Sequence, residues 1–467
     1  MKDFLYKILF FSTIAVVLVF SVQTVAPFAH FEPLNGVTEK LEKPELTFRN
    51  YADGALQNYT DAYLREHFGF RELLIRYYNQ FLMSCFHETN NENVLIGKDG
   101  WLFGQQYVRN HYESLMYEFT NDTAEMREVF ETEALRLWKV QELLKEYDIH
   151  IFVNITPSKD VIYPEYLPKN RTYLRPDGLH AYDYYKKRFD ELGIQYIDWV
   201  PVFQEIRDSV DYQLFPKVGT HWSNIASVYA FDSIVRYMEI IGNQNLVNLD
   251  IGEKFQSETR KPDNDLELLL NLASPIKSPP NQYAEVRVIR DSTASKPYFT
   301  VVGDSFYWNI IYNVPLWETF RKFPYWYYNH TIHGDENNKY TLDVDPEKEL
   351  MRTDYIMLTY GPVSLYEFSS CFLPRTLLHL CYDRAAIDSA ATEMIKGWKS
   401  DPEKFEYYEK VSKSSQMSMD KIMRNDALYL LRMHPEDYFD DLKGAKLPIS
   451  RNSNLKTLRK ELSASQS

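Results

Sequence analysis

The sequence predicts an α/β fold built on a mostly parallel sheet, and three features of the chain indicate it. "YFTVV" (298–302) and "YIMLT" (355–359) are short apolar runs of the kind that a parallel sheet buries on both faces. From about residue 122, segments with helical spacing alternate with strand-like segments, which is typical of α/β proteins. Helix signals stand at the expected places, with Ser223 predicted as an N-cap and Gly193 as a helix stop.

The other elements are expected in order along the chain. Residues 50–86 have helical character with a break at Gly69, and "NENVLIGKDGWLF" carries turn residues between two apolar pieces and is expected to form a hairpin. In the α/β region we expect strands at 149–157 and 194–198, helices at 182–193 and 223–242, and mostly helices after about residue 384.

The start of the chain predicts a membrane segment. Lys2 and Lys7 precede a run without charge from Ile8 through Ala29, which is long enough to cross a bilayer as a helix. A cleaved signal peptide is the alternative, but Pro27 directly follows the small residues "TVA" and fits a processing site poorly. We therefore favour an uncleaved anchor whose lysines stay inside, so that the body of the protein lies outside the cytoplasm.

The chain is expected to divide into four parts. These are the anchor (1–29), a linker rich in Glu, Lys and Pro (30–48), the α/β domain (49–375), and a helical C-terminal extension with a loose tail (376–467).

The composition excludes several classes of partner and site. A net charge of −14 argues against a nucleic-acid partner, because phosphates need a basic surface. Cys85, Cys371 and Cys381 are too few for a zinc cluster or a disulfide framework, although Cys371 and Cys381 could pair in an oxidising compartment. No metal site is indicated, "HTIHGDE" (330–336) is expected to be a polar loop, and no cofactor is expected.

Ser305 and His221 are the candidate catalytic residues. Ser305 follows the strand "YFTVV" and precedes a predicted helix, and in a parallel sheet ligands bind at the carboxyl ends of the strands. A serine there can expose its hydroxyl beside backbone N–H groups that could hold an oxyanion. A serine nucleophile needs a base, and His221 in "GTHWSNIASVYA" stands between a loop and a helix start. Asp304 is assigned to the turn, and Tyr360 is either a pocket residue or simply the end of a strand.

Together, "GTHWSNIASVYA" and the later "VVGDSF" resemble the SGNH-hydrolase-like domain of the alginate O-acetylation proteins, of the AlgJ and AlgX type. The segments "VLIGKDGWLF", "ITPSKDVIYPEYLP", "GIQYIDWVPVF" and "TDYIMLTYGP" agree in order, so that the similarity spans roughly residues 50–370. The resemblance implies an SGNH or flavodoxin-like three-layer sandwich.

The resemblance also implies acyl chemistry. Ser305 would attack an acetyl donor, His221 would move the proton, and the acceptor would be a hydroxyl group of a cell-envelope or exported polysaccharide. A membrane-bound acyltransferase is the implied supplier of acetyl groups. An acetyl esterase would use the same residues, and a catalytically impaired glycan-binding or scaffold component of an export complex is a further alternative.

One position departs from the family pattern. Where the family has the acid of an Asp-x-His motif, this chain has Gly219. The carboxylate behind a catalytic histidine fixes its tautomer, and losing that function in a serine protease costs about 10⁴ in kcat. Asp198 or Asp211 could supply the acid, a Ser-His pair could work slowly, or the site could be inactive.

Overall fold

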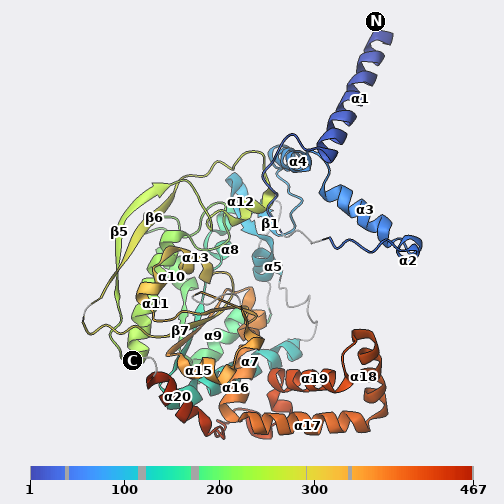
Figure 1. Ribbon diagram of the computed structural model, residues 1–467. Coiled ribbons are helices and arrows are strands. Elements are labelled where there is room, and N and C mark those ends of the chain that lie inside the picture. Colours follow the sequence, from blue (N-terminus) through green and yellow to red (C-terminus); the bar gives the residue numbers. More distant parts are fainter. Residues whose placement is uncertain are drawn as a thin grey trace.

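The computed structural model describes residues 2–36, 41–113, 123–169, 178–290, 292–334 and 339–464. Figure 1 shows a rounded α/β body, a long N-terminal helix that projects from it, and a group of C-terminal helices on the opposite side.

A seven-stranded sheet forms the centre of the body, in the order β10-β9-β8-β7-β11-β3-β4. Its strands are β3 (His150–Ile155), β4 (Tyr196–Asp198), β7 (Phe299–Gly303), β8 (Tyr325–Tyr327), β9 (Thr331–His333), β10 (Lys339–Tyr340) and β11 (Tyr355–Tyr360). The neighbours from β8 to β4 pair in parallel, and β9 and β10 add an antiparallel edge. The predicted mostly parallel sheet is therefore confirmed.

One expectation for this edge is wrong. Residues 331–333 of the expected polar loop form β9, because they pair with Tyr325–Tyr327 in the sheet. Residues 335 and 336 of that segment lie outside the described residues.

Helices cover both faces of the sheet. The α-helices of the body are α5 (Gln105–Glu113), α7 (Thr123–Leu144), α8 (Lys159–Ile162), α9 (Ala181–Leu192), α10 (Trp199–Ile206), α11 (Asn224–Gly242), α12 (Asp265–Leu270), α13 (Tyr307–Asn313), α14 (Leu316–Thr319), α15 (Pro346–Arg352) and α16 (Phe372–Cys381). Short 3-10 turns lie at Lys98–Gly100, Lys145–Tyr147, Pro164–Tyr166, Thr341–Asp343, Ser364–Cys371, Pro435–Asp437 and Asp440–Leu442.

Alternating side chains of the buried strands build two cores. On β11, Ile356 and Leu358 pack with α7, α9 and α16, whereas Tyr355 and Met357 pack with α11 and α13. All four side chains are almost fully buried, and each contributes about 1.5–3 kcal/mol through removal of its surface from water. This alternation gives the three-layer arrangement that the resemblance implied.

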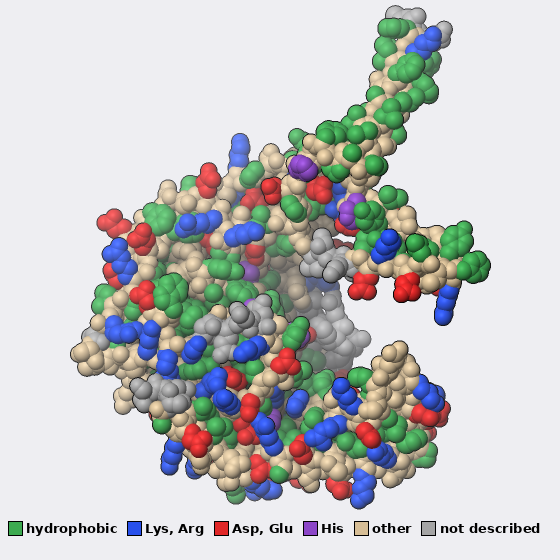
Figure 2. Space-filling view, in the orientation of Figure 1, with side chains coloured by type: hydrophobic (Ala, Val, Ile, Leu, Met, Phe, Trp, Pro, Cys, Tyr) green, Lys and Arg blue, Asp and Glu red, His purple; other side chains and the backbone are tan. Residues whose placement is uncertain are grey.

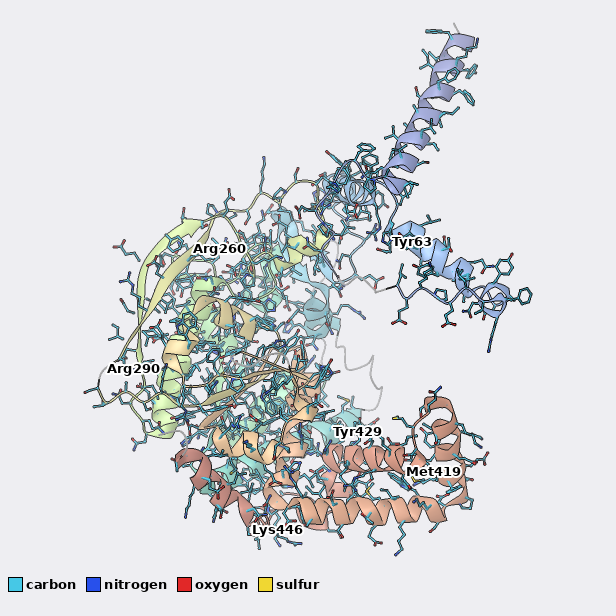
Figure 3. The ribbon with its side chains drawn as sticks, viewed as in Figure 1. Tyr63, Arg260, Arg290, Met419, Tyr429 and Lys446 are labelled. Atoms are coloured by element: carbon cyan, nitrogen blue, oxygen red, sulfur yellow. The ribbon has the colours of Figure 1, made fainter. Side chains whose placement is uncertain are left out.

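Two antiparallel pairs stand beside the main sheet. The hairpin of β1 (Val94–Ile96) and β2 (Leu102–Gly104) is confirmed. A longer ribbon joins β5 (Asn248–Ser257) to β6 (Asn281–Ile289), and α12 lies in the chain between these two strands. Arg260 and Arg290, labelled in Figure 3, follow the ends of β5 and β6.

The C-terminal part is helical, as expected, with α17 (Arg384–Ser400), α18 (Pro402–Ser415), α19 (Met419–Met433) and α20 (Asn454–Ala464). The tail is not loose up to residue 464. Leu455 of α20 is fully buried, and Arg459 donates hydrogen bonds to Met351 O and Thr353 O. The expected domain boundary at residue 375 falls inside α16, which packs on the central sheet.

The N-terminal part consists of α1 (Lys2–Val25), α2 (Phe48–Ala52), α3 (Ala55–Glu66) and α4 (Arg71–Phe86). Within α1, residues Phe4–Val25 are long and apolar enough to cross a membrane. The predicted break at Gly69 is confirmed, since α3 ends at Glu66 and α4 begins at Arg71.

Candidate active site

Ser305 lies on the turn that connects β7 to α13. The turn is held by the fully buried Asp304, whose carboxylate accepts hydrogen bonds from the backbone N–H of Phe306 at 3.1 Å and of Gly361 at 2.6 Å. Burial raises the pKa of Asp304, although these hydrogen bonds oppose the rise. Asp304 thus belongs to the turn, as the sequence indicated, and it ties the end of β7 to the segment after β11.

Close packing explains why β7 ends in glycine. A Cβ atom at Gly303 would stand 1.9 Å from the carbonyl oxygen of Thr359 on β11. Any side chain there would push the two strands apart and displace Ser305 with them. Tyr360 ends β11, and its buried hydroxyl contacts Ser370 Oγ at 3.2 Å, so it is the end of a strand rather than a pocket residue.

The structure brings the two sequence-predicted residues together. His221 Nε2 lies 2.8 Å from Ser305 Oγ, which is hydrogen-bond distance. The imidazole also meets the ring of Phe306 edge to face, with centroids 4.9 Å apart. A proton can therefore pass between the hydroxyl and the imidazole without a large movement.

A carboxylate that the sequence analysis did not single out stands behind the histidine. Asp265 Oδ2 lies 3.1 Å from His221 Nδ1, which is ion-pair distance. The other oxygen, Oδ1, accepts hydrogen bonds from the backbone N–H of Thr220 at 2.7 Å and of Leu266 at 3.0 Å. Asp265 is thus oriented by the loop that carries His221 and by the start of its own helix, α12.

The His221 imidazole and the Asp265 carboxylate each stabilise the charged form of the other. Burial alone would lower the pKa of His221, but the Asp265 carboxylate outweighs it and raises the pKa above its usual value. Burial would raise the pKa of Asp265, but contact with His221 and the N–H of Thr220 keeps it below its usual value. Asp265 is therefore ionised at neutral pH and stabilises the protonated imidazole.

The two acids suggested from the sequence are wrong for this position. Asp198 caps α10 through the N–H of Val200 and pairs with Lys186, and Asp211 forms an ion pair with Lys254. Each of these carboxylates is paired with a lysine, on α9 or on β5, whereas Asp265 in the insertion between β5 and β6 lies at ion-pair distance from His221.

Gly219 and Asp265 are linked by packing. A Cβ atom at Gly219 would lie 2.5 Å from the carbonyl oxygen of Asp263 and 2.8 Å from the ring of Pro216. The backbone that leads to Asp265 therefore occupies the space that a side chain at 219 would need. The same packing therefore explains why residue 219 is glycine and how the chain reaches Asp265.

Asp263 joins the two halves of the site. Its buried carboxylate accepts hydrogen bonds from Asn309 Nδ2 on α13, from Asn281 Nδ2 on β6 and from the backbone N–H of Asn224 on α11, at 3.3–3.4 Å. Burial raises its pKa to about 6. Asn309 also donates to the carbonyl of Trp222 at 2.8 Å, so the helix after Ser305 is fixed to the helix after His221.

Lys159 also holds the loop that carries His221. Its buried ammonium donates to three backbone carbonyls, those of Leu102 at 2.7 Å, Lys217 at 2.9 Å and Gly219 at 2.8 Å. The pKa of Lys159 is lowered by burial. The lysine thereby joins the β1–β2 hairpin to the loop that carries the histidine.

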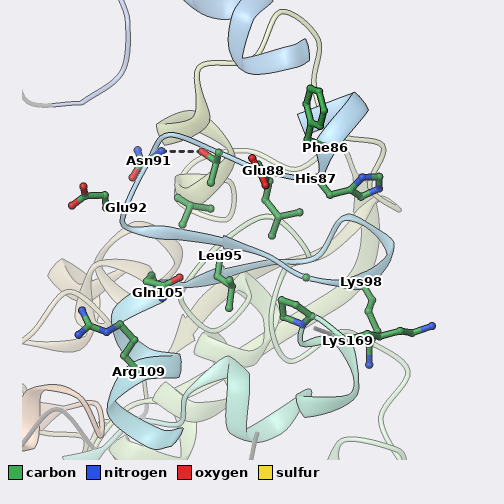
Figure 4. Close-up of a pocket in the computed structure, with 15 residues that line it drawn as sticks. Phe86, His87, Glu88, Asn91, Glu92, Leu95, Lys98, Gln105, Arg109 and Lys169 are labelled. Atoms are coloured by element: carbon green, nitrogen blue, oxygen red, sulfur yellow. Dashed lines mark hydrogen bonds between the residues drawn. The ribbon is translucent and has the colours of Figure 1, made fainter. Parts of the chain in front are cut away.

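A large groove lies away from this site. It has a volume of about 930 Å³ and runs between the end of α4 and the β1–β2 hairpin, with Phe86, Glu88, Lys98, Arg109 and Lys169 on its walls (Figure 4). Its lining carries both signs of charge and contains neither Ser305 nor His221. Within the described residues, no group of three or more His, Cys, Asp or Glu side chains converges as a metal site would require.

The comparisons with known proteins agree with the resemblance noted from the sequence. Residues 94–313 match the protein family described as "SGNH hydrolase-like domain, acetyltransferase AlgX". This match confirms the resemblance and the fold class. None of the curated proteins matches the chain.

Three solved structures are similar to this chain in part. The O-acetyltransferase domain of Pseudomonas putida AlgJ is 16% identical, with a TM-score of 0.40, over 61% of this chain and 98% of that one. Pseudomonas aeruginosa AlgX is 13% identical, with a TM-score of 0.36, over 59% of this chain and 67% of that one. Bacillus cereus PatB1 is 12% identical, with a TM-score of 0.35, over 59% of this chain and 99% of that one.

Proposed function

We propose that this chain, whose residues 94–313 carry an SGNH hydrolase-like domain of the AlgX acetyltransferase family, is a membrane-anchored O-acetyltransferase that modifies a polysaccharide outside the cytoplasm. The observation that carries the proposal is the line of contacts from Ser305 Oγ to His221 Nε2 and from His221 Nδ1 to Asp265 Oδ2. Serine, histidine and carboxylate in this order are the groups that acyl transfer through a covalent serine intermediate requires.

In the first half of the reaction, Ser305 Oγ attacks the carbonyl carbon of the acetyl donor. The bond between Oγ and the acetyl carbon forms, the bond from that carbon to the leaving group breaks, and His221 Nε2 carries the proton from serine to the leaving group. The backbone N–H of Ser305 has no hydrogen-bond acceptor among the described residues, so it is available to the developing oxyanion.

In the second half, a sugar hydroxyl attacks the acetyl-serine. His221 accepts the hydroxyl proton and returns it to Ser305 Oγ as the ester bond to the enzyme breaks, and the acetyl group stays on the sugar. Asp265 keeps Nδ1 protonated, which leaves Nε2 free to act as the base.

Aromatic side chains on α13, the helix that follows Ser305, and on the neighbouring strands support a sugar as acceptor. Trp308 stacks on the exposed Tyr312, with ring centroids 5.9 Å apart, and meets Tyr327 and His333 of the neighbouring strands. Trp308 stands one helical turn after Ser305. Amphipathic rings at a half-exposed rim offer apolar faces to sugar C–H groups and polar edges to their hydroxyls.

Packing at the end of α1 supports a retained anchor. The ring of Phe20 packs against Phe68 and Phe70, with centroids 5.5 and 5.1 Å away, and Thr24 Oγ1 accepts a hydrogen bond from the backbone N–H of Gly69. A Cβ atom at Gly69 would lie 2.7 Å from Phe20 O, so this corner is built around α1. Cleavage after α1 would leave that packing without its partner, which favours an anchor over a removed signal.

A fluorophosphonate probe tests the nucleophile, since it labels only an activated serine. The wild-type chain in detergent should be labelled, Ser305→Ala should not, and Ser209→Ala, which removes an exposed serine hydroxyl after α10, should be labelled like wild type. Equal labelling of Ser305→Ala and wild type would overturn the assignment.

A second assay separates transferase from esterase. With an activated acetyl ester as donor, an oligosaccharide acceptor should divert acetyl groups from water to sugar, detected by mass spectrometry of the sugar. Release of acetate alone at every acceptor concentration would identify an esterase, and absence of any turnover would favour the glycan-binding alternative.

A further inference from the structure

Large apolar side chains are exposed far more densely in residues 46–86 than in the rest of the body, and we call this segment the N-terminal collar. The exposed members are Leu46, Phe48, Tyr51, Tyr63, Leu64, Phe68, Leu74, Tyr77, Tyr78, Phe81 and Phe86. Exposed apolar patches of this kind mark interaction surfaces rather than ordinary solvated surface. Figure 2 shows hydrophobic side chains covering α1 and gathering again on the helices at its base.

The collar lies at the outer end of the membrane-type helix. Figure 1 shows α3 and α2 running outward from the base of α1, across its direction, with α4 beside that base. Figure 3 shows Tyr63 on the α3 arm, away from the α/β body. Because Phe20 of α1 packs on Phe68 and Phe70, the collar cannot swing freely from the helix end.

One side of α4 forms hydrogen bonds with the α/β body, and another side exposes apolar side chains. Asn79 Nδ2 donates to Leu270 O at 2.8 Å, and Gln80 Oε1 accepts from the backbone N–H of Ser274 at 3.1 Å. The exposed Leu74, Tyr78, Phe81 and Cys85 follow one another at spacings of three and four residues, which places them along one stripe of the helix.

The composition of the collar fits the boundary between lipid and water. Tyrosine rings are favoured at the headgroup level, because they combine an apolar body with a polar hydroxyl. Arg49 in α2 supplies a positive charge for lipid phosphates, whereas Arg65 in α3 forms an ion pair with Asp61. A wholly apolar occupant would leave these guanidinium groups and hydroxyls unsolvated.

We propose that the collar lies in the outer interface of the phospholipid bilayer that α1 spans, with the α4 stripe against the lipid. This inference rests on the proposed anchoring of α1. The occupant is a lipid surface, chosen because the apolar collar is continuous with α1 and held rigidly at its end. The membrane then sets the orientation of the α/β domain above it, since Asn79 and Gln80 fasten α4 to the body.

Lipid-depth quenching on the full chain tests the proposal. The chain is placed in nanodiscs of phosphatidylcholine and phosphatidylglycerol, and a bimane label is attached to the exposed Cys85 in a Cys371→Ser background. Lipids with a nitroxide near the headgroup should quench this label several-fold more than they quench a label at Ser414→Cys on α18. Figure 1 places α18 far from α1.

One further label and one variant separate failure of the anchor from failure of the collar proposal. A label at Thr13→Cys in the middle of α1 should be quenched by a nitroxide deep in the acyl chain, and absence of that quenching would overturn the anchoring itself. If Thr13→Cys is quenched and Cys85 is not, the anchor stands and the collar proposal fails. Replacing Leu74, Tyr78 and Phe81 by serine should reduce quenching at Cys85 to the level of the α18 label while the Thr13→Cys signal persists.

Discussion

The turn that carries Ser305 and the loop that carries His221 contact each other through His221 Nε2 and Ser305 Oγ and through Trp222 Nε1 and Phe306 O, but different parts of the chain hold them. Ser305 stands at the end of a central strand, and Asp304, the residue before it, anchors the turn to its own backbone and to the end of the neighbouring strand. The loop of His221 is held by Lys159 after β3 and by Asp265 from the insertion between β5 and β6. The turn of the proposed nucleophile is thus held within the central sheet, whereas the loop of the proposed base is held by a lysine after β3 and by an inserted segment.

The largest effect should follow from removing the distant acid. Asp265→Asn keeps the shape of the side chain but no longer stabilises the imidazolium or fixes its tautomer, so kcat for acetyl transfer should fall roughly 10³- to 10⁴-fold, as in serine proteases. The rate of acetyl-ester turnover measures this loss of kcat. Asp211→Asn, at an acid suggested from sequence alone, should stay within about twofold of wild type. Equal losses in both variants would show that Asp265 has no special role.

The same variant should change the pH profile of kcat/KM. His221 acts as a base only when neutral, and the Asp265 carboxylate raises its pKa, so wild-type activity should fall with decreasing pH at a midpoint above the usual histidine value. Removing that charge lowers the pKa of His221, and the acid limb of the remaining activity in Asp265→Asn should move to lower pH. An unchanged limb would contradict the proposed coupling.

A carboxylate at the family position should not rescue this site. In Gly219→Asp the new Cβ would collide with the backbone of Asp263, which leads to Asp265, so we expect activity to fall roughly 10²-fold through displacement of the acid. Combining it with Asp265→Asn should add little further loss, because both changes remove the same contact. Recovery of activity in the double variant would show that a carboxylate at position 219 can replace Asp265.

Replacing Lys159, whose ammonium binds the loop of His221, should affect both the free energy of unfolding and kcat. Lys159→Met removes a donor from the carbonyls of Leu102, Lys217 and Gly219, of which that of Lys217 keeps the N–H of Leu102. The free energy of unfolding should fall by roughly 2–4 kcal/mol, and kcat should drop about tenfold because the loop of His221 loosens. Thermal unfolding and ester turnover measure the two effects. The exposed Lys396→Met serves as the control, and an unchanged melting temperature for Lys159→Met would refute the role.

The smallest effect should lie on the acceptor side. Trp308→Ala removes the ring that we assign to the sugar, on the helix that follows Ser305, so KM for an oligosaccharide acceptor should rise several-fold while hydrolysis of a small acetyl ester changes less than twofold. Parallel loss in both reactions would indicate that the tryptophan only supports the fold.

The same contrast explains what the sequence could and could not predict. The strands, the capped helix after His221 and the serine turn depend on neighbouring residues, so their patterns were visible and the structure agrees with them. Asp265 stands in "KPDNDLE", where nothing in the local pattern distinguishes it from an exposed acid, and only the path of the insertion brings it to His221. Lys159 was likewise hidden, because its partners are backbone carbonyls, which leave no trace in residue types.

Gly219 also bears on how such proteins are sorted in genome surveys. A search that requires an acid two positions before the histidine would discard this chain, although Asp265 Oδ2 lies 3.1 Å from His221 Nδ1. The backbone of Asp263, which leads to Asp265, fills the space that a side chain at position 219 would need. Three-dimensional searches for a carboxylate near Nδ1 would recover relatives that a linear motif discards.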